Sequence, residues 1–380
     1  MFLNPFILSS LVWIFVIILY KLKISQLYPI LELDLMLFCL IIIFIKFIFG
    51  IFIFRKRKIF FIGIEKNFGI RYFLLFIGFF VEFVYIGKIP LVEIILKTGY
   101  SYQDFHGIKI LHVILVTYNI YLILCAFNNY IVYKKYKYIF YILIGISIYF
   151  LLYVRGYILL ICICCFFIMF FYHQTLKNII KISLMTIIFL YLFGVTGNIR
   201  HNYKWNDTIA IKQIARINIK KNMLDPFMWS YVYITSPLGN LQYNFTNTEP
   251  IYKKDIYIYE NLLPDMISKR INYKEVSTKL MTRPLTVSTG YVKSYLTYGQ
   301  LGMYMTFIIY TAFQLVVIKI VKNSKYYIVI LSLLTTLDLL MIFSNLFILS
   351  GFSFSFVFFV IDIILEKLKN IKIKKFRYKK

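Results

Sequence analysis

Long apolar stretches alternate with short polar segments along most of the chain. About 20 apolar residues in an α-helix cross the hydrocarbon core of a bilayer, and these stretches approach that length. They stay apolar throughout, whereas the strands of a membrane β-barrel alternate between apolar and polar residues. The pattern therefore predicts an all-α integral membrane protein with about ten transmembrane helices. The predicted spans are residues 5–20, 35–54, 72–86, 110–127, 139–153, 157–172, 182–197, 301–318, 327–346 and 353–366.

One segment, residues 198–300, breaks this pattern because it is long and polar and holds most of the prolines. A connection of this length is usually either functional or disordered. Its aromatic residues, Trp229 and Tyr231 among them, argue against disorder. The chain is therefore expected to divide into residues 1–197 with seven spans, the large outer loop 198–300, and residues 301–380 with three spans and a basic tail.

The composition restricts the class of protein further. Hydrophobic residues make up 61% of the chain and charged residues 16%, and the mean hydropathy is +0.77. Soluble domains are about 45–50% apolar and about 25% charged. A soluble enzyme, a disordered protein and a disulfide-stabilised scaffold are therefore excluded.

The net charge indicates an orientation in the membrane. The chain carries 43 Lys and Arg against 16 Asp and Glu, a formal net charge of +27. On a soluble protein this excess would favour nucleic acid binding, but in a membrane protein basic residues concentrate in the cytoplasmic loops. With ten spans, the short basic loops and the basic tail fall on one side. We therefore expect both termini in the cytoplasm, the bilayer as a partner and no nucleic acid partner.

The cysteines give no sign of a metal site. Cys39, Cys125, Cys162, Cys164 and Cys165 all lie in apolar stretches, and their spacing does not match a zinc site. They are interpreted as small hydrophobic residues of the helix bundle. No other spacing of His, Cys and acidic residues indicates a metal, so no metal or cofactor is expected.

Several short motifs occur in the segments that are predicted to lie on the outer side. In chain order they are Glu82 followed by Pro90-Leu91, Gly107-Ile-x-x-Leu-His112, the turn Val154-Arg-Gly156, Gly197-Asn-Ile-Arg200, Tyr233-Ile-Thr-Ser-Pro-Leu-Gly-Asn-Leu241, Thr286-Val-Ser-Thr-Gly-Tyr291 and Tyr295-Leu-Thr-Tyr-Gly-Gln-Leu-Gly302. Each motif is short and unspecific, and the order in which they follow one another carries the information.

This order resembles that of the Wzy-type O-antigen and capsule polymerases, the oligosaccharide repeat unit polymerases. The resemblance runs from about Glu82 to Gly302, and the layout of the spans fits the rest. Tyr298 stands where the family often has an acid before the first glycine of the last motif, so we assign no catalytic role to that position.

The resemblance implies a metal-independent polysaccharide polymerase with the fold of the helical GT-C class of membrane glycosyltransferases. It would act in the bacterial cytoplasmic (inner) membrane. Its partners would be an undecaprenyl-pyrophosphate-linked glycan donor and a lipid-linked acceptor, with a separate chain-length regulator as a further partner. The growing glycan would be transferred to a sugar hydroxyl of the incoming repeat unit.

Arginines at the outer ends of spans are candidates for binding the pyrophosphate, because a guanidinium can hold two phosphate oxygens at once. They are Arg155, Arg200 and Arg283, and Arg200 is also expected to be catalytic by stabilising the charge of the leaving group. Tyr291 is expected to bind the substrate, since tyrosine rings can stack on sugar faces. For Arg155 the alternative is an anchor whose charge reaches the lipid headgroups.

The acceptor hydroxyl requires a general base or a strong hydrogen-bond acceptor. Glu82 and His112 are the favoured catalytic candidates, and Asp104, His201 and Glu249 remain open at this point. Glu82 lies near the end of a predicted span, where an ionisable residue is a functional hypothesis by default. Structural pairing is the alternative for Glu82, and an interfacial hydrogen bond is the alternative for His112.

Three charged residues, Lys46, Asp338 and Asp362, fall inside predicted spans. Such residues can form an ion or proton relay in a transporter, or they can pair with each other between helices.

Two other functions stay open. An O-antigen ligase would use the same donor with a different acceptor, and a flippase for lipid-linked oligosaccharides would use the charges for transport.

Overall fold

The computed structural model describes residues 4–54, 62–64, 66–100, 104–200, 209–217 and 226–377. In these ranges the chain forms helices and one isolated bridge, between Ser25 and Ile217. The helices are α1 (Pro5–Lys21), α2 (Leu33–Phe54), α3 (Phe68–Ile86), α4 (Pro90–Ile95), α5 (Leu111–Tyr133), α6 (Lys137–Leu151), α7 (Arg155–Tyr172), α8 (Leu176–Arg200), α9 (Ile209–Ala215), α10 (Phe227–Asn247), α11 (Lys254–Asn261), α12 (Asp265–Ser268), α13 (Val292–Val321), α14 (Tyr327–Leu340), α15 (Ser350–Ser353) and α16 (Ser355–Arg377).

Each of the predicted spans overlaps a helix, although the span predicted at 327–346 is longer than α14, which ends at Leu340. The prediction of an all-α fold is confirmed, and its apolar helices are compatible with a membrane protein. Within the described ranges, five helices are long and apolar enough to cross a bilayer, namely α2, α3, α5, α7 and α13. The apolar helices α1, α6 and α14 are shorter. On α2 and α3, large side chains such as Phe52 and Phe80 are 70% and 68% exposed. Lipid rather than water is the fitting environment for such a surface.

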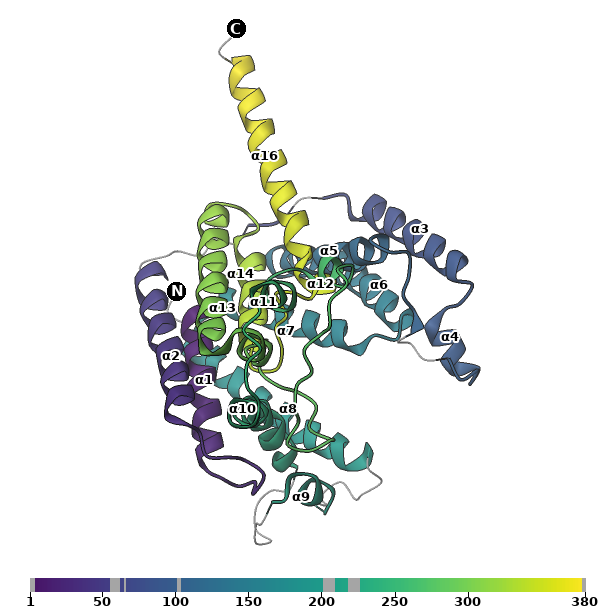
Figure 1. Cartoon of the computed structure of the whole chain (residues 1–380). Coiled ribbons are helices and arrows are strands. Elements are labelled where there is room, and N and C mark those ends of the chain that lie inside the picture. The colour runs from purple at the N-terminus through teal and green to yellow at the C-terminus, as the bar shows by residue number, and fades with distance from the viewer. Residues whose placement is uncertain are drawn as a thin grey trace.

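The first two helices form an antiparallel pair at one side of the molecule (Figure 1). The side chain of Asn4 accepts a hydrogen bond from the Ile7 N–H, and it donates another to the Gly50 carbonyl over 3.1 Å. Asn4 thus caps α1 and ties its start to the end of α2. A Cβ on Gly50 would lie 2.5 Å from the Ile7 side chain, so glycine is needed for this close approach.

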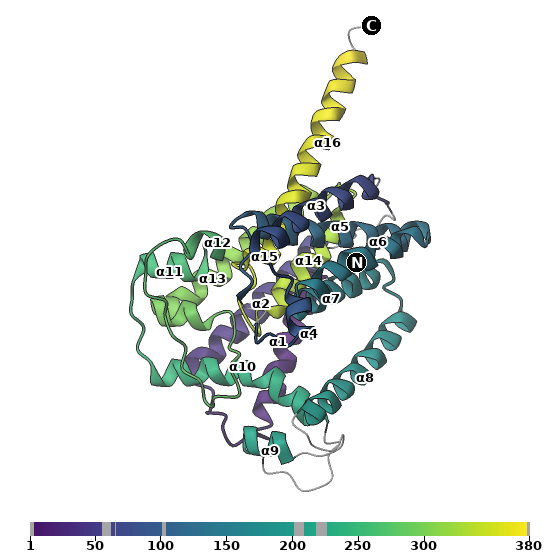
Figure 2. The same cartoon turned by 90° about the vertical axis from the view of Figure 1, so that its right-hand side faces the viewer.

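The segment between α8 and α13 contains a long helix that the sequence reading left inside a loop. This helix, α10, packs against α8 and α1 near the end of the molecule where α9 also lies (Figure 2). Several of its polar residues are buried, with the motif residue Asn240 and the later Asn244 both 0% exposed. At the opposite end, α16 extends away from the other helices in both views (Figures 1 and 2).

Helix α13 is interrupted near its beginning. Gly299 has φ 66° and ψ −158°, outside the helical region, and only glycine adopts this conformation readily. The interruption frees the carbonyls of Leu296 and Thr297, which accept hydrogen bonds from the N–H groups of Ile251 and Lys253. The predicted start of the span at residue 301 therefore matches the second part of α13, and the Tyr-x-x-x-Gly-x-x-Gly motif forms the break that precedes it.

Candidate functional site

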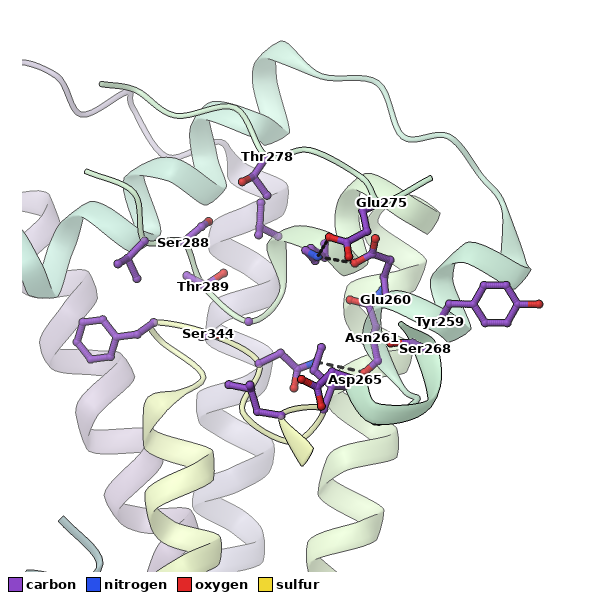
Figure 3. Close-up of a pocket in the computed structure, with 18 of the residues that line it drawn as sticks. Tyr259, Glu260, Asn261, Asp265, Ser268, Glu275, Thr278, Ser288, Thr289 and Ser344 are labelled. Atoms are coloured by element: carbon purple, nitrogen blue, oxygen red, sulfur yellow. Dashed lines mark hydrogen bonds and ion pairs between the residues drawn. The ribbon is translucent and has the colours of Figure 1, made fainter. Parts of the chain in front are cut away.

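A cleft of about 490 Å³ opens where the loop between α10 and α13 meets the chain that follows α14 (Figure 3). Ser288 and Thr289 lie on one side of it in the view, and Glu260, Asn261 and Asp265 lie on the other. Most of the lining residues carry polar groups, which include carboxylates, hydroxyls, amides and amines. It consists of Tyr259, Glu260, Asn261, Asp265, Ser268, Lys269, Tyr273, Glu275, Thr278, Thr286, Val287, Ser288, Thr289, Gly290, Val292, Lys293, Phe343, Ser344, Asn345, Ile348 and Leu349.

One wall of the cleft carries two carboxylates and a lysine. The Lys293 Nζ lies 2.5 Å from a Glu260 carboxylate oxygen and 3.9 Å from a Glu275 oxygen. Glu260 is almost fully buried, and its other oxygen accepts a hydrogen bond from the Val276 N–H. The Glu275 side chain is 64% exposed. Glu260 is therefore fixed by its partners, and Glu275 is the carboxylate of this wall that remains accessible.

Asp265 joins this wall to the chain after α14. Its Oδ1 accepts a hydrogen bond from the Ser350 N–H over 2.8 Å, and its Oδ2 pairs with Lys269 at 3.2 Å. Partial burial by itself would raise the pKa of Asp265. The hydrogen bonds from Ser350 and the charge of Lys269 outweigh that effect, so the pKa lies below its usual value. Asp265 is thus a structural carboxylate that stays ionised.

A buried polar network joins α11, whose last residues line the cleft, to α13. Ser294 donates to the Asn261 side-chain oxygen over 2.8 Å and also contacts Thr306 at 2.8 Å. The Tyr257 hydroxyl lies 2.9 Å from the same Thr306 oxygen. All four residues are buried. Satisfied buried networks of this kind hold elements rigidly, so α11 and the start of α13 form a fixed base.

The motif helix α10 holds the opposite wall in place. The Asn240 side chain donates to the carbonyls of Leu285 and Val287 over 2.7 and 2.8 Å, and it accepts from the Met281 N–H. Because all of its hydrogen-bonding groups are used for backbone contacts, Asn240 positions the cleft wall and does not face the cleft.

Glu82 and His112, predicted separately as catalytic residues, lie in direct contact. The Glu82 Oε2 is 3.0 Å from the His112 Nδ1, and the Oε1 accepts a hydrogen bond from the Ile108 N–H. Glu82 is fully buried, whereas the His112 side chain is 22% exposed. An ionised carboxylate can only accept, so in that state Nδ1 carries the hydrogen, and when the ring is neutral Nε2 has the lone pair.

The Gly-Ile-x-x-Leu-His motif has a local steric reason. Gly107 has φ 59°, and a Cβ there would lie 2.7 Å from the His112 Cβ. The ring edge of Phe105 also packs on the imidazole, with centroids 5.6 Å apart. The glycine therefore allows the loop to close over His112, and the ring is held from both sides.

Arg155 is the first residue of α7 and is exposed, with its guanidinium carbon 5.7 Å from the Tyr153 ring. The preceding residue, Val154, gives the helix no side-chain cap, and a Cβ on Gly156 would meet open space. The first N–H groups of α7 are therefore accessible beside a guanidinium, an arrangement that suits an anionic group.

The other predicted substrate-binding residues are placed differently. Arg283 is exposed on a turn and does not line the cleft. Tyr291 is 2% exposed, packs against Trp13 and Phe38, and follows the cleft residue Gly290. Arg200 is the last residue of α8, and its side chain lies outside the described part.

The three remaining base candidates do not line the cleft either. Asp104 and Glu249 are exposed, and His201 lies outside the described residues. Sequence reasoning missed the carboxylates that do line the cleft, Glu260, Asp265 and Glu275. They follow no period and belong to no motif, so no signal in the sequence distinguished them from other acids of the loop.

The short helix α15 contacts several elements that carry candidate residues. It contacts α5, which carries His112 in its first turn, and its Ser350 holds Asp265 of the cleft. On another side, a Cβ on Gly351 would lie 2.1 Å from the Tyr157 hydroxyl of α7, two residues after Arg155. Elements that carry the cleft residue Asp265, His112 and Arg155 therefore all contact α15.

Charged residues inside the helix bundle form ion pairs. Lys46 of α2 pairs with Asp338 of α14 at 2.5 Å, and Lys66 pairs with Asp362 of α16. Of the two interpretations of these charges, pairing between helices is what the structure displays. In the part of the chain that is described, no group of three or more His, Cys, Asp or Glu is arranged to hold a metal ion.

Comparison with protein families finds no family model that matches the chain, and comparisons with curated proteins and with solved structures find no match either. The likeness to the Wzy-type polymerases therefore depends on the order of the motifs alone and remains a prediction. The class that the fold supports is that of multi-pass α-helical membrane proteins.

Proposed function

We propose that the protein is a membrane glycosyltransferase that joins oligosaccharide units carried on undecaprenyl pyrophosphate into a polysaccharide. In this proposal the ten helices α1, α2, α3, α5, α6, α7, α8, α13, α14 and α16 cross the bacterial cytoplasmic membrane, and both termini lie in the cytoplasm. The cleft and Arg155 then lie on the outer side, where the lipid-linked substrates are presented.

The observation that carries the proposal is the cleft itself. Two motif segments of the resemblance, residues 286–291 and 295–302, form its wall or its supporting break, and a third, 233–241, holds that wall in place. Its volume of about 490 Å³ falls in the range of pockets for small organic ligands. Carboxylates, amides and hydroxyls in one cavity are the groups that hydrogen-bond sugar hydroxyls.

Arg155 is the proposed ligand of the donor pyrophosphate. Its guanidinium and the free N–H groups of the first turn of α7 both favour an anion. As the bond between the anomeric carbon and the phosphate oxygen breaks, negative charge grows on that oxygen. A positioned arginine stabilises this charge in the transition state.

His112 is the proposed general base, and Glu82 is the residue that positions it. The acceptor hydroxyl attacks the anomeric carbon and loses its proton to the His112 Nε2, while undecaprenyl pyrophosphate departs. The contact of Glu82 with Nδ1 fixes the ring and stabilises the imidazolium that forms. The sugar–phosphate bond is thus exchanged for a glycosidic bond without a further reactant.

Deletion of the gene, with complementation by variants, tests the proposal. We expect the deletion to leave single repeat units and remove long chains, as seen on a gel of the surface polysaccharide. The native gene should restore long chains, and His112→Ala should fail to do so at an equal protein level. A general base contributes about 10²–10⁴-fold to a rate.

Two outcomes would overturn the proposal. Normal chain length in the deletion strain would reject a polymerase. Loss of even the single-repeat material from its final acceptor would instead indicate a ligase, the alternative function with the same donor.

A further inference from the structure

Two polar atoms of the cleft lack hydrogen-bond partners among the described residues. They are the Asn345 Oδ1 and the Ser288 Oγ, and both atoms are shielded from solvent. Asn345 is only 9% exposed, and both residues line the cleft. A buried acceptor without a partner costs about 1–3 kcal/mol, so each such atom in a native protein requires an explanation.

The orientation of the Asn345 amide is determined by its neighbours. Its Nδ2 lies 3.2 Å from the Asn261 carbonyl oxygen and 2.9 Å from the Tyr310 hydroxyl oxygen. The Tyr310 hydroxyl itself donates to the Asn261 carbonyl, so it is free to accept at this contact. A flipped amide would place oxygen against the carbonyl oxygen of Asn261. The amine is therefore on that side, and the Oδ1 is the atom without a partner.

The two atoms belong to chain segments that are joined directly. The Gly290 N–H donates to the Met341 carbonyl over 2.7 Å, and a Cβ on Gly290 would lie 3.0 Å from the Asn345 backbone nitrogen. Segment 286–290 thus runs beside segment 343–349, and both segments line the cleft. In the close-up, Ser288 and Ser344 appear on this side of the pocket (Figure 3).

The charges of the cleft restrict the ligand. Glu260 is paired with Lys293, and Asp265 is paired with Lys269. The exposed Glu275 is then left as the carboxylate in excess on the lining. An anionic ligand would meet repulsion here, whereas an uncharged group that donates hydrogen bonds would satisfy the Asn345 Oδ1 and the Ser288 Oγ.

We propose that Asn345 and Ser288 form a subsite for an uncharged sugar unit, which donates an O–H or N–H group to the Asn345 Oδ1 and hydrogen-bonds the Ser288 hydroxyl. The assignment of this sugar to the repeat unit rests on the proposed function. The subsite itself stands on the geometry of the cleft. It predicts a preference for neutral sugars over uronic acids.

Saturation-transfer NMR on the purified full-length protein tests the subsite, with glucose, N-acetylglucosamine and glucuronate as probes. We expect at least one neutral sugar to bind and glucuronate to bind at least several-fold more weakly. Ser288→Ala removes a hydroxyl that has no partner among the described residues, so the melting temperature should be unchanged. The dissociation constant of the neutral sugar should rise about three- to tenfold, the effect of one hydrogen bond.

Ser147→Ala is the matched control, because the Ser147 hydroxyl is exposed and bonds only within its own helix. It should bind the sugar as the native protein does. Asn345→Ala should weaken binding at least as much as Ser288→Ala where its melting temperature shows that it folds. If that variant does not fold, Ser288→Ala decides the question.

The subsite is overturned if no neutral sugar binds, if Ser288→Ala binds as tightly as the native protein, or if glucuronate binds as tightly as the neutral sugars. These failures are distinct from failure of the polymerase. Normal chain length in the deletion strain, together with the expected binding pattern, would reject the polymerase and leave the subsite standing. Loss of long chains with unchanged binding in Ser288→Ala would do the reverse.

Discussion

The ion pair between Lys46 and Asp338 offers the sharpest test of what holds the helices together. The two side chains are only 2% and 4% exposed, their charged atoms lie 2.5 Å apart, and the Lys46 amine also donates to the Ser9 hydroxyl over 2.9 Å. The Lys46 amine pairs with Asp338 Oδ1, and Asp338 Oδ2 has no hydrogen-bond partner among the described residues. Each charge thus depends on the other for its stability.

The energetic consequence follows from burial. Lys46→Met leaves the Asp338 carboxylate buried without its counterion. Asp338→Leu leaves the ammonium with the Ser9 hydroxyl and the Phe307 ring as neutral neighbours. Breaking a buried pair from one side costs about 3–5 kcal/mol, because an uncompensated charge remains in a low-dielectric site. The double variant removes both charges. Replacement of a whole pair by apolar residues is often close to neutral, so the two single effects should not add.

Unfolding of the purified protein in mixed detergent micelles with increasing dodecyl sulfate measures these free energies. As a control we choose Lys325→Met, which removes the same group from the pair with Glu366, whose side chains are 24% and 39% exposed. That pair should contribute about 0–1 kcal/mol. Single variants at Lys46 and Asp338 that cost no more than the control, or a double variant that costs their sum, would refute the reasoning.

Further predictions concern the site. Arg155→Ala should slow polymerisation in membranes roughly 30- to 1000-fold, which corresponds to a loss of about 2–4 kcal/mol of transition-state stabilisation. Arg155→Lys should recover only part of the native rate, and Arg270→Ala, which removes an exposed arginine, should leave the rate unchanged. Equal rates in all three variants would reject the phosphate assignment. The depressed pKa of Asp265 means that its stabilising contribution is complete above its unfolded pKa of about 3.9 and is lost as the pH falls through the folded pKa. The melting temperature should therefore drop on acidification below about pH 4, and Asp265→Asn should flatten that drop; an unchanged pH profile in the variant would contradict this. Asn240→Leu should destabilise the protein by on the order of 2–4 kcal/mol, since it leaves buried backbone groups unpaired. In thermal melts it should lose far more than Asn247→Ala, whose exposed amide bonds within its own helix, and similar losses would show that the wall does not depend on Asn240.

Part of the candidate site could be read from the sequence. The motifs predicted Glu82 and His112 as candidate residues, and the structure adds that their side chains are in contact. The motif residue Asn240 has a structural role, because its side-chain amide forms its hydrogen bonds with backbone groups of the neighbouring cleft wall. Spacing along the chain shows that such residues form a pattern, but it does not show which way a side chain points.

The carboxylates of the cleft, Glu260, Asp265 and Glu275, could not be found in this way. They become a site through contacts with Lys293 and with Ser350, which is 85 residues from Asp265 in the chain. Contacts across such distances depend on how the helices pack, and no local pattern records them. The same holds for the Asn345 amide, which follows α14 and lies far from residues 198–300 in sequence.

The sequence alone indicated a bundle of apolar helices suited to a membrane, and roughly where each of those apolar helices lies, but not the more polar helices such as α10. Apolar runs of span length have no other stable arrangement in lipid, because every backbone polar group must be satisfied within the helix. Only the tertiary structure decided which polar side chains meet. That selection arises from pairing between distant segments, where the cost of burying a charge or an amide is offset by one particular partner.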